Sequence, residues 1–244
     1  MAEPLQIIHE DGDLLAVSKA AGVPAIPERY DRQMLSAFEM LKENRPGLLV
    51  VHRIDKETSG LLVFCKTENA LRHLGAQFAG GDGNRFLRKD YLAILEGRPL
   101  WNEAGEESPL LPDADRRHRT IVSPDGKKSV TRFTVLERFR GHCFVQACPA
   151  TGRTHQIRAH AARLGHPVLC DSLYGSGRPL FLSAIKRRYK PPAEGEKPLL
   201  ARLALHAAAL EFIHPASGRS LRLEAPLPKD LRAALAQLRK TGGA

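Results

Sequence analysis

The sequence predicts an α+β fold with a mixed, mainly antiparallel central β-sheet flanked by helices and loops. Segments with strand patterning dominate the middle of the chain, and helical segments fall between them without a regular βαβ alternation. The composition, 43% hydrophobic and 26% charged, is that of a globular protein. No internal repeat and no shift in composition marks a boundary, so we expect one domain over residues 1–244.

Strand signals recur from residue 60 onward, several of them with alternating apolar and polar residues. The first strand directly follows a polar loop, an arrangement that sets the side chains of a loop against a rigid sheet. The expected strands are residues 60–65, 91–95, 131–139, 142–147 and 220–224.

Apolar residues at helical spacing predict helices between and after these strands. In the second helix, for example, Leu71, Leu74 and Phe78 lie on one face. Gly165 supplies a stop signal for the third helix and Pro228 a start signal for the fourth. The expected helices are residues 33–43, 68–79, 153–164 and 229–239.

Two stretches, residues 101–119 and 183–198, are expected to be loop insertions because they are rich in proline and charged residues. The first ends in a basic run at residues 116–119, and the second carries Lys186, Arg187 and Arg188. A charge run is often only a solvated face. Here it agrees with the charge of the whole chain, so we favour contact with phosphates.

The charge balance favours a polyanionic partner. Lysine and arginine number 37 and aspartate and glutamate 27, a net charge of +10. The chain has no phosphate-binding P-loop, no complete dinucleotide fingerprint and no GxSxG nucleophile turn, so nucleotide-dependent and hydride chemistry have no support. It also has no apolar run of the roughly 18 residues that a membrane span needs.

Cysteine usage and the first residues indicate the compartment. The four cysteines form no CxxC pair, which argues against a disulfide scaffold and against a structural zinc site. The first residues lack the basic stretch and apolar core of a signal peptide. We therefore expect a cytoplasmic protein.

Two segments are dense in chemically capable side chains, residues 51–63 and 150–160. A carboxylate such as Asp55, kept ionised by a nearby arginine, can stabilise or trap an oxocarbenium-like centre, and on a basic protein this suits work on the sugar of a nucleic acid. Asp55 could equally be a turn or cap residue paired with Arg53 or Arg158. The spacing around Asp55 does not match a kinase catalytic loop. Binding of a metal by His52, His155 and His160 is disfavoured because no carboxylate joins them at the spacing of a metal site.

The string HRIDKETSGLL at residues 52–62 matches the HRLDxxTSGLL motif of the RsuA/RluA pseudouridine synthases, and the chain resembles the RluA-type branch. The string TGRTHQIRAH at residues 151–160 and the segment 165–171 reinforce the resemblance. Weaker similarity, which includes a strand region at residues 7–19, extends it over nearly the whole chain. Cys170 stands where the family usually has a glycine, which puts the local turn geometry in doubt.

The resemblance implies isomerisation of a uridine in structured RNA to pseudouridine, without cofactor or metal. Asp55 falls on the essential aspartate, which either attacks the anomeric carbon or helps to remove the 2′ proton of the sugar. Tyr91 falls on the aromatic residue that stacks on the flipped uracil. Arg158 falls on the arginine that pairs with the aspartate, and Arg53 on a residue that enters the base stack. The catalytic set is therefore Asp55, Tyr91 and Arg158, around a basic cleft.

The RNA partner is expected to be a stem-loop of transfer or ribosomal RNA, bound by a monomer through the catalytic domain itself, because no S4-like domain precedes the motif. The residues expected to contact RNA are His52, Arg53, Arg153, Thr154, His155, Lys186, Arg187 and Arg188. Two other hypotheses stay open. A non-catalytic RNA-binding or ribosome-assembly factor would tolerate Asp55→Asn, and a metal-dependent nuclease would require a divalent ion.

Overall fold

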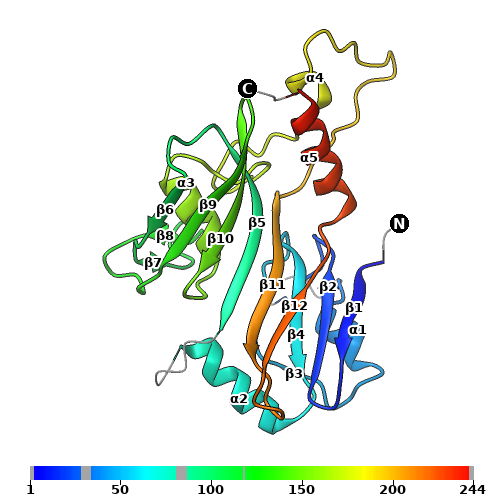
Figure 1. Ribbon diagram of the computed structural model, residues 1–244, viewed down its shortest axis with the longest axis vertical. Coiled ribbons are helices and arrows are strands. Elements are labelled where there is room, and N and C mark those ends of the chain that lie inside the picture. Colours follow the sequence, from blue (N-terminus) through cyan, green and yellow to red (C-terminus); the bar gives the residue numbers. More distant parts are fainter. Residues whose placement is uncertain (1–2, 29–33, 81–86, 118, 242–244) are drawn as a thin grey trace. The chain divides into compact units, whose positions relative to one another are not determined.

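The computed structural model describes residues 3–28, 34–80, 87–117 and 119–241. The chain divides into two compact units. Unit 1 contains residues 1–91 and 206–226, and unit 2 contains residues 92–205 and 227–244. Figure 1 follows the chain from blue at the N-terminus to red at the C-terminus. The organisation as a single domain stays a prediction.

Unit 1 is built on a mixed sheet in which the order of strands is β1, β2, β4 and β11, with β3 added to β4 and β12 to β11. Strand β4 pairs antiparallel with β2 and parallel with β11. The strands are β1 (Leu5–Glu10), β2 (Leu14–Lys19), β3 (Leu49–Val50), β4 (Ser59–Cys65), β11 (Leu205–Ile213) and β12 (Ser220–Glu224). The predicted α+β class with a mixed sheet is confirmed.

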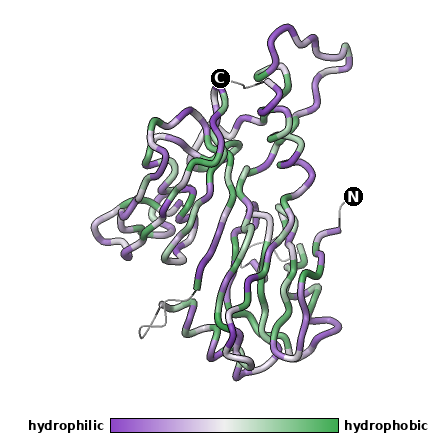
Figure 2. Tube along the Cα trace, in the orientation of Figure 1, coloured by the Kyte–Doolittle hydropathy of each residue, from purple (hydrophilic) through white to green (hydrophobic). Residues whose placement is uncertain are grey.

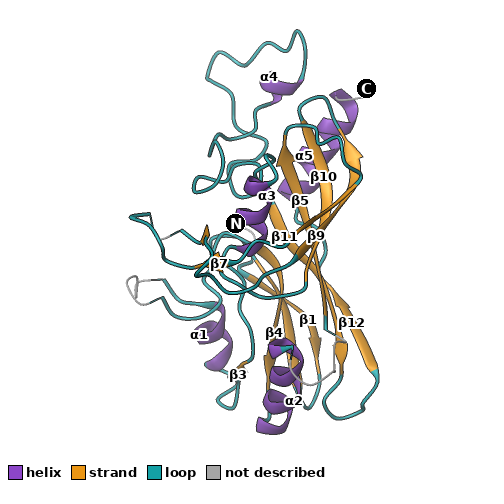
Figure 3. Ribbon diagram, turned by 90° about the vertical axis from the view of Figure 1, so that its left-hand side faces the viewer, coloured by secondary structure: helices purple, strands orange, loops and turns teal. Residues whose placement is uncertain are grey.

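Two helices in the described part of unit 1, α1 (Ala37–Lys42) and α2 (Glu68–Ala79), pack on opposite faces of its sheet. Because side chains alternate along a strand, β4 gives Leu62 and Phe64 to one core and Leu61 and Val63 to the other. All seven residues of β4 are buried as a result. A strand covered on both faces reads as a continuous apolar run, as this one does. Figure 3 shows both helices against the strands.

The ends of these helices follow from capping. Helix α1 begins at Ala37 and not at residue 33, because Ser36 and Glu39 form a reciprocal capping box. Residue 33 lies outside the described residues. Helix α2 has the predicted bounds, with the Thr67 side chain accepting the Ala70 N–H and Gly80 ending the helix at φ 68°.

Unit 2 contains the second part of β5 (Arg88–Glu96), which enters it at Leu92, followed in the sheet by β10, β9 and β6. The pairings β9–β10 and β6–β9 are antiparallel. The other strands are β6 (Glu103–Glu106), β7 (Leu110–Leu111), β8 (Ile121–Val122), β9 (Thr131–Arg138) and β10 (His142–Pro149), of which β7 and β8 form a separate sheet. The segment 101–119 thus holds strands where only loop was expected. Its residue 118 lies outside the described residues.

The described residues of unit 2 also form three helices: α3 (Gln156–Arg163), α4 (Leu182–Ile185) and α5 (Lys229–Thr241). Helix α3 lies against the β9–β10 hairpin (Figure 1). Helix α5 buries an apolar face that includes Leu231, Leu235 and Leu238. Figure 2 shows the segment after α4 as mostly hydrophilic, in contrast to the apolar strands. None of the helices in the described part of the chain is long and apolar enough to cross a bilayer.

Candidate active site

The loop that precedes β4 carries His52, Arg53 and Asp55, all in unit 1. The His52 ring stacks on Phe78 of α2 at 4.5 Å, and its Nε2 accepts the Val63 N–H at 3.0 Å. Burial, and then the charge of Lys89, lower the pKa of His52 to about 3. The imidazole is therefore neutral, and because Nε2 is an acceptor the proton resides on Nδ1.

This hydrogen bond supplies an acceptor for the Val63 N–H, which lies between the residues of β4 that pair with β3 and those that pair with β11. Strand β3 pairs with Cys65 and Phe64, and β11 pairs with Ser59 and Gly60. Between these two pairings, the imidazole of His52 takes the place of a backbone acceptor for Val63. His52 thereby fixes the point at which the loop leaves the sheet, three residues before Asp55.

The backbone around Asp55 is held from two directions. The Thr58 N–H donates to the Asp55 carbonyl at 3.1 Å and forms a turn. The next carbonyl, that of Lys56, accepts the Gly22 N–H at 2.8 Å and the Lys19 ammonium at 3.1 Å. Lys19 is 1% exposed, and its ammonium also donates to the carbonyls of Ala20 and Val23. No motif in the sequence indicates this role of Lys19, and its only signal is a lysine at the end of a mainly apolar strand.

Tyr91 lies on β5 and is the last residue of the first of the two chain segments that make up unit 1. Alternation along the strand puts Lys89 and Tyr91 on one face, while buried Asp90 points to the other and pairs with Arg88 and Arg222. Burial, and then the negative charge of Asp55, hold the pKa of the Tyr91 hydroxyl above its usual range. The charge of Asp55 therefore reaches Tyr91 within unit 1. Tyr91 also borders a small recess together with His52 and Lys89.

Gly60 sets how closely β4 and β11 approach beside this loop. Its φ is 116°, in a region that favours glycine. A methyl group there would collide with the Ala207 carbonyl oxygen and lie 2.7 Å from the Ala207 nitrogen. The glycine of the motif is therefore required by the parallel pairing of the two strands.

In unit 2, Arg158 lies on α3 in a buried bidentate ion pair with Asp171. Its Nε and Nη2 donate to the two carboxylate oxygens at 2.7 and 2.8 Å. Burial alone would raise the pKa of Asp171, but the guanidinium and the N–H groups of Leu173 and Tyr174 hold it below the usual range. The guanidinium also lies over the Tyr174 ring at 5.2 Å. The orientation of Arg158 is thus fixed by Asp171, a role of Asp171 that was not predicted from the sequence.

The N-terminus of α3 begins after His155, which adopts φ 51° and provides no side-chain cap. The Gln156 side chain instead holds the preceding loop, because its Oε1 accepts the Arg153 N–H at 3.0 Å and the Thr151 hydroxyl at 2.7 Å. The left-handed residue explains why the helix starts three residues later than predicted. Of the predicted RNA contacts in this segment, Arg153 is exposed, while Thr154 and His155 are half-buried.

Cys170, directly before Asp171, adopts φ 62°. The left-handed conformation is the one that glycine takes without steric cost. Its thiol points inward, 3.5 Å from the Leu200 carbonyl oxygen. The turn expected of a glycine thus forms with cysteine in its place.

The other predicted RNA contacts lie on the surface of their units. Arg53 is exposed in unit 1, and Lys186, Arg187 and Arg188 are exposed directly after α4 in unit 2. The predicted set is therefore distributed over both units, with His52, Arg53, Asp55 and Tyr91 in unit 1 and the remainder, Arg158 included, in unit 2.

Within the described residues, one group has the side-chain types of a metal site: Asp11, Asp13 and His214. The Asp11 carboxylate already accepts hydrogen bonds from the side chains of His9 and His214 and from the N–H groups of Asp13 and Leu14. These contacts close the turn between β1 and β2. We assign a structural role to the group and no ion.

Comparison with known proteins identifies the family. Residues 13–163 match the family described as RNA pseudouridylate synthase. Ribosomal large subunit pseudouridine synthase C of Vibrio cholerae is 38% identical over 239 residues, which cover 96% of this chain and 69% of that protein. The chain belongs to the RNA pseudouridylate synthase family. It is an RNA pseudouridine synthase, an enzyme that isomerises uridine to pseudouridine in RNA, and the family membership expected from its motifs is confirmed.

Further relatives of this synthase agree. Ribosomal large subunit pseudouridine synthase D of Xanthomonas campestris is 35% identical over 248 residues, which cover 97% of this chain and 70% of that protein. The solved structure of Human RNA Pseudouridylate Synthase Domain Containing 4 superposes with a TM-score of 0.71 at 23% identity and covers 96% of this chain and 92% of that one. The second comparison supports the fold alone.

Proposed function

We propose that Asp55, Tyr91 and Arg158 are the catalytic residues of this synthase and that its substrate is large-subunit ribosomal RNA. The observation that carries the proposal is the proximity of Asp55 and Tyr91 in unit 1, where the charge of the carboxylate adds to burial in raising the pKa of the Tyr91 hydroxyl. The ribosomal substrate is taken from the names of the relatives, which are ribosomal large subunit synthases.

Asp55 acts on the ribose of the target uridine. The reaction breaks the bond between the anomeric carbon and a ring nitrogen, and a new bond forms from the same carbon to a ring carbon. The ring carbon loses its proton and the nitrogen gains one, so no oxidant or reductant is needed. A carboxylate can assist by attacking the anomeric carbon or by removing the 2′ proton, and both routes require the ionised form. The Lys56 carbonyl, held by Lys19 and Gly22, keeps the loop in place during either route.

Tyr91 contacts the uracil. The phenol is protonated at neutral pH, and burial together with the charge of Asp55 raises its pKa further, so the residue offers a neutral aromatic face for stacking and a hydrogen-bond donor. A stacking partner is physically required because extrusion of a base from its stack costs a few kcal/mol. The side chain sits on a strand and is therefore ordered before the RNA binds.

Arg158 is assigned to the catalytic set from its place in the second motif. A bidentate partner and two further N–H groups on the same carboxylate fix Asp171, and Asp171 fixes the guanidinium. Such a buried charge is expensive to displace, since removal of one partner from a buried pair costs about 3–5 kcal/mol. The orientation of this positive charge is thus fixed within unit 2 before RNA binds.

The exposed cations contact the RNA. Arg53 enters the base stack, and Arg153, Lys186, Arg187 and Arg188 contact phosphates. Thr154 and His155 add polar contacts at the start of α3. The contribution of His52 comes through its Nδ1 edge, because Nε2 and the ring face are used inside unit 1. The enzyme acts as a monomer with one catalytic domain in the cytoplasm.

Release of tritium tests the proposal. Large-subunit ribosomal RNA without modifications, labelled on the uracil carbon that becomes the new attachment point, is incubated with wild type and with Asp55→Asn, in the presence of a chelator and without nucleotide. We expect release by wild type only, while both proteins bind the RNA with nearly equal affinity. Mapping of the product to one site in this RNA completes the assignment.

Each other outcome supports a different conclusion. Equal release by Asp55→Asn would remove Asp55 from the catalytic set. Binding without release from ribosomal or transfer RNA would favour a non-catalytic factor, and shortened RNA that depends on a divalent ion would favour a nuclease. Release from transfer RNA alone would overturn the ribosomal substrate while leaving the chemistry intact.

A further inference from the structure

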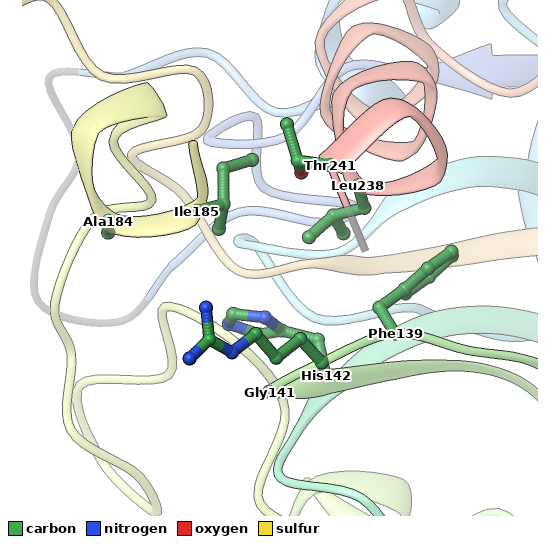
Figure 4. Close-up of a pocket in the computed structure, with 8 residues that line it drawn as sticks. Phe139, Gly141, His142, Ala184, Ile185, Leu238 and Thr241 are labelled. Atoms are coloured by element: carbon green, nitrogen blue, oxygen red, sulfur yellow. The ribbon is translucent and has the colours of Figure 1, made fainter. Parts of the chain in front are cut away.

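Unit 2 contains a pocket of about 270 Å³ that no residue of the proposed catalytic set lines. It lies where the turn between β9 and β10 meets α4 and the end of α5 (Figure 4). Its size is just below the range of about 300–1,000 Å³ of drug-sized ligand sites, so it suits a single ring system. The lining residues are Phe139, Arg140, Gly141, His142, Ala184, Ile185, Leu238 and Thr241.

The walls of the pocket are apolar on one side and polar on the other. In Figure 4, Ile185 and Leu238 lie across the pocket from His142, with Phe139 at one end. Phe139 is 5% exposed and Leu238 is 2% exposed, so both are held rigidly by the core. A slot with rigid apolar walls suits the face of a flat ring.

The polar groups suit the edge of a nucleobase and a phosphate. His142 is half-buried, and burial lowers its pKa, so the neutral imidazole offers one donor and one acceptor at neutral pH. Arg140 is exposed and forms no ion pair with any residue that the structure describes. A guanidinium beside an apolar slot provides a bidentate donor for a phosphate.

The chain next to the lining residue Ile185 carries more positive than negative charge. Directly after Ile185, the chain exposes four cations that have no carboxylate partner in the described part of the chain: Lys186, Arg187, Arg188 and Lys190. The acids in these segments are fewer than the cations. Glu137 pairs with Arg239, and Glu196 accepts the Ser183 N–H. Glu194 is exposed in the same segment, and the charge of Glu96 acts on His142. The pocket is therefore complementary to a polyanion that also carries rings.

We propose that this pocket binds one unstacked nucleotide of the RNA substrate, with the base in the slot and its phosphate on Arg140. It is a second RNA subsite, lined by none of the residues proposed to act on the reacting uridine. The inference depends on RNA being the substrate, and it is independent of the role proposed for Asp55.

The variant Ala184→Trp tests the subsite because Ala184 lines the pocket and is exposed, so an indole there fills the slot from the solvent side. The matched control is Ala233→Trp, at an exposed position of α5 that does not line the pocket. Circular dichroism and thermal melting verify that both variants fold. The affinity for unmodified ribosomal RNA is then measured by fluorescence anisotropy, and tritium release gives KM and kcat.

We expect Ala184→Trp to weaken RNA binding about tenfold, within the range of base stacking, and to raise KM with kcat unchanged, as loss of uniform binding does. Arg140→Gln should reduce the slope of log affinity against log salt by about 0.7, the value for one single-strand phosphate. Equal affinities of the two tryptophan variants, together with an unchanged salt slope for Arg140→Gln, would overturn the subsite and leave the pocket to a ligand of another class, such as an apolar peptide. Failure of the Asp55 assignment would show instead as release by Asp55→Asn.

Discussion

At the scale of single residues, His52 shows how a titratable side chain can accept a hydrogen bond from a backbone N–H inside a sheet. Its Nε2 accepts the Val63 N–H, an arrangement that only the neutral imidazole permits. The native pKa of about 3 is far below the unfolded value of 6.5. The native state therefore binds fewer protons than the unfolded state between these values, and stability rises with pH across this window.

The variant His52→Phe makes this testable. A phenyl ring preserves stacking on Phe78 but leaves the Val63 N–H without its acceptor, so we expect a loss of about 1–3 kcal/mol at pH 7.5. At pH 5 the wild type also loses about 2 kcal/mol because the unfolded His52 is protonated, and the phenylalanine variant does not. The gap between the two proteins should therefore shrink at the lower pH in urea unfolding.

The control for this experiment is His73→Phe, at an exposed position of α2. Its stability relative to wild type should be the same at both pH values. A constant gap between wild type and His52→Phe at pH 7.5 and pH 5 would show that His52 is not held neutral by burial.

The residues of the site were predictable to different degrees. Asp55 and Tyr91 lie far apart in the sequence, and the family motifs assigned them to one site, which composition and spacing alone could not do. Lys19, Gln156 and Asp171 were not assigned roles. Each of them forms hydrogen bonds or an ion pair with groups that the fold brings close to it. A single sequence carries no signal for such pairings.

At the scale of elements, the pairing of β4 with β11 depends on Gly60. The parallel register joins only two pairs of residues, Ser59 with His206 and Gly60 with Ala207. It is supported by a hydrogen bond between the Ser59 hydroxyl and His206 Nδ1 at 3.0 Å. A change in this short pairing would displace β4, the strand that follows the loop carrying Asp55.

We expect Gly60→Ala to destabilise the protein by about 3 kcal/mol or more and to abolish activity, because the added methyl group collides with Ala207 and the φ of 116° is unfavourable for alanine. Gly75→Ala is the matched control. Nothing lies within 4 Å of a methyl group at Gly75, and alanine in a helix interior stabilises by about 1 kcal/mol. Thermal melting and tritium release check both variants, and a wild-type melting temperature for Gly60→Ala would contradict the proposed close approach.

The elements that the sequence predicted well are those with strong local patterns. Helix α2 has a cap, a glycine stop and regular apolar spacing, and its bounds agree with the prediction. Strand β11, LHAAALEFI, was not predicted, because its alanines give no strand signal and it forms through pairing with partners distant in sequence. Strand β6, EAGE, is likewise formed by its pairing with β9 and not by strand propensity.

At the scale of the whole molecule, the excess of positive charge is only useful to RNA binding where the cations are not already paired. Arg45 and Lys66 both pair with Glu10, and Arg222 pairs with Asp90 and Glu224. By contrast, the exposed cations that follow α4 have no such partners within the described ranges. The net charge of +10 therefore overstates the number of phosphates that the protein can neutralise.

Salt dependence measures this number directly. The triple variant Lys186→Gln, Arg187→Gln, Arg188→Gln and the control Arg45→Gln, Lys66→Gln, Arg222→Gln both reduce the net charge from +10 by three, to +7. We expect the first to reduce the slope of log affinity against log salt by about 2–3, since each phosphate contact contributes roughly 0.7–0.9. The control should retain the wild-type slope, because its cations are held by carboxylates. Equal reductions in both variants would mean that affinity follows overall charge, and an unchanged slope in the first would remove the segment after α4 from the path of the RNA.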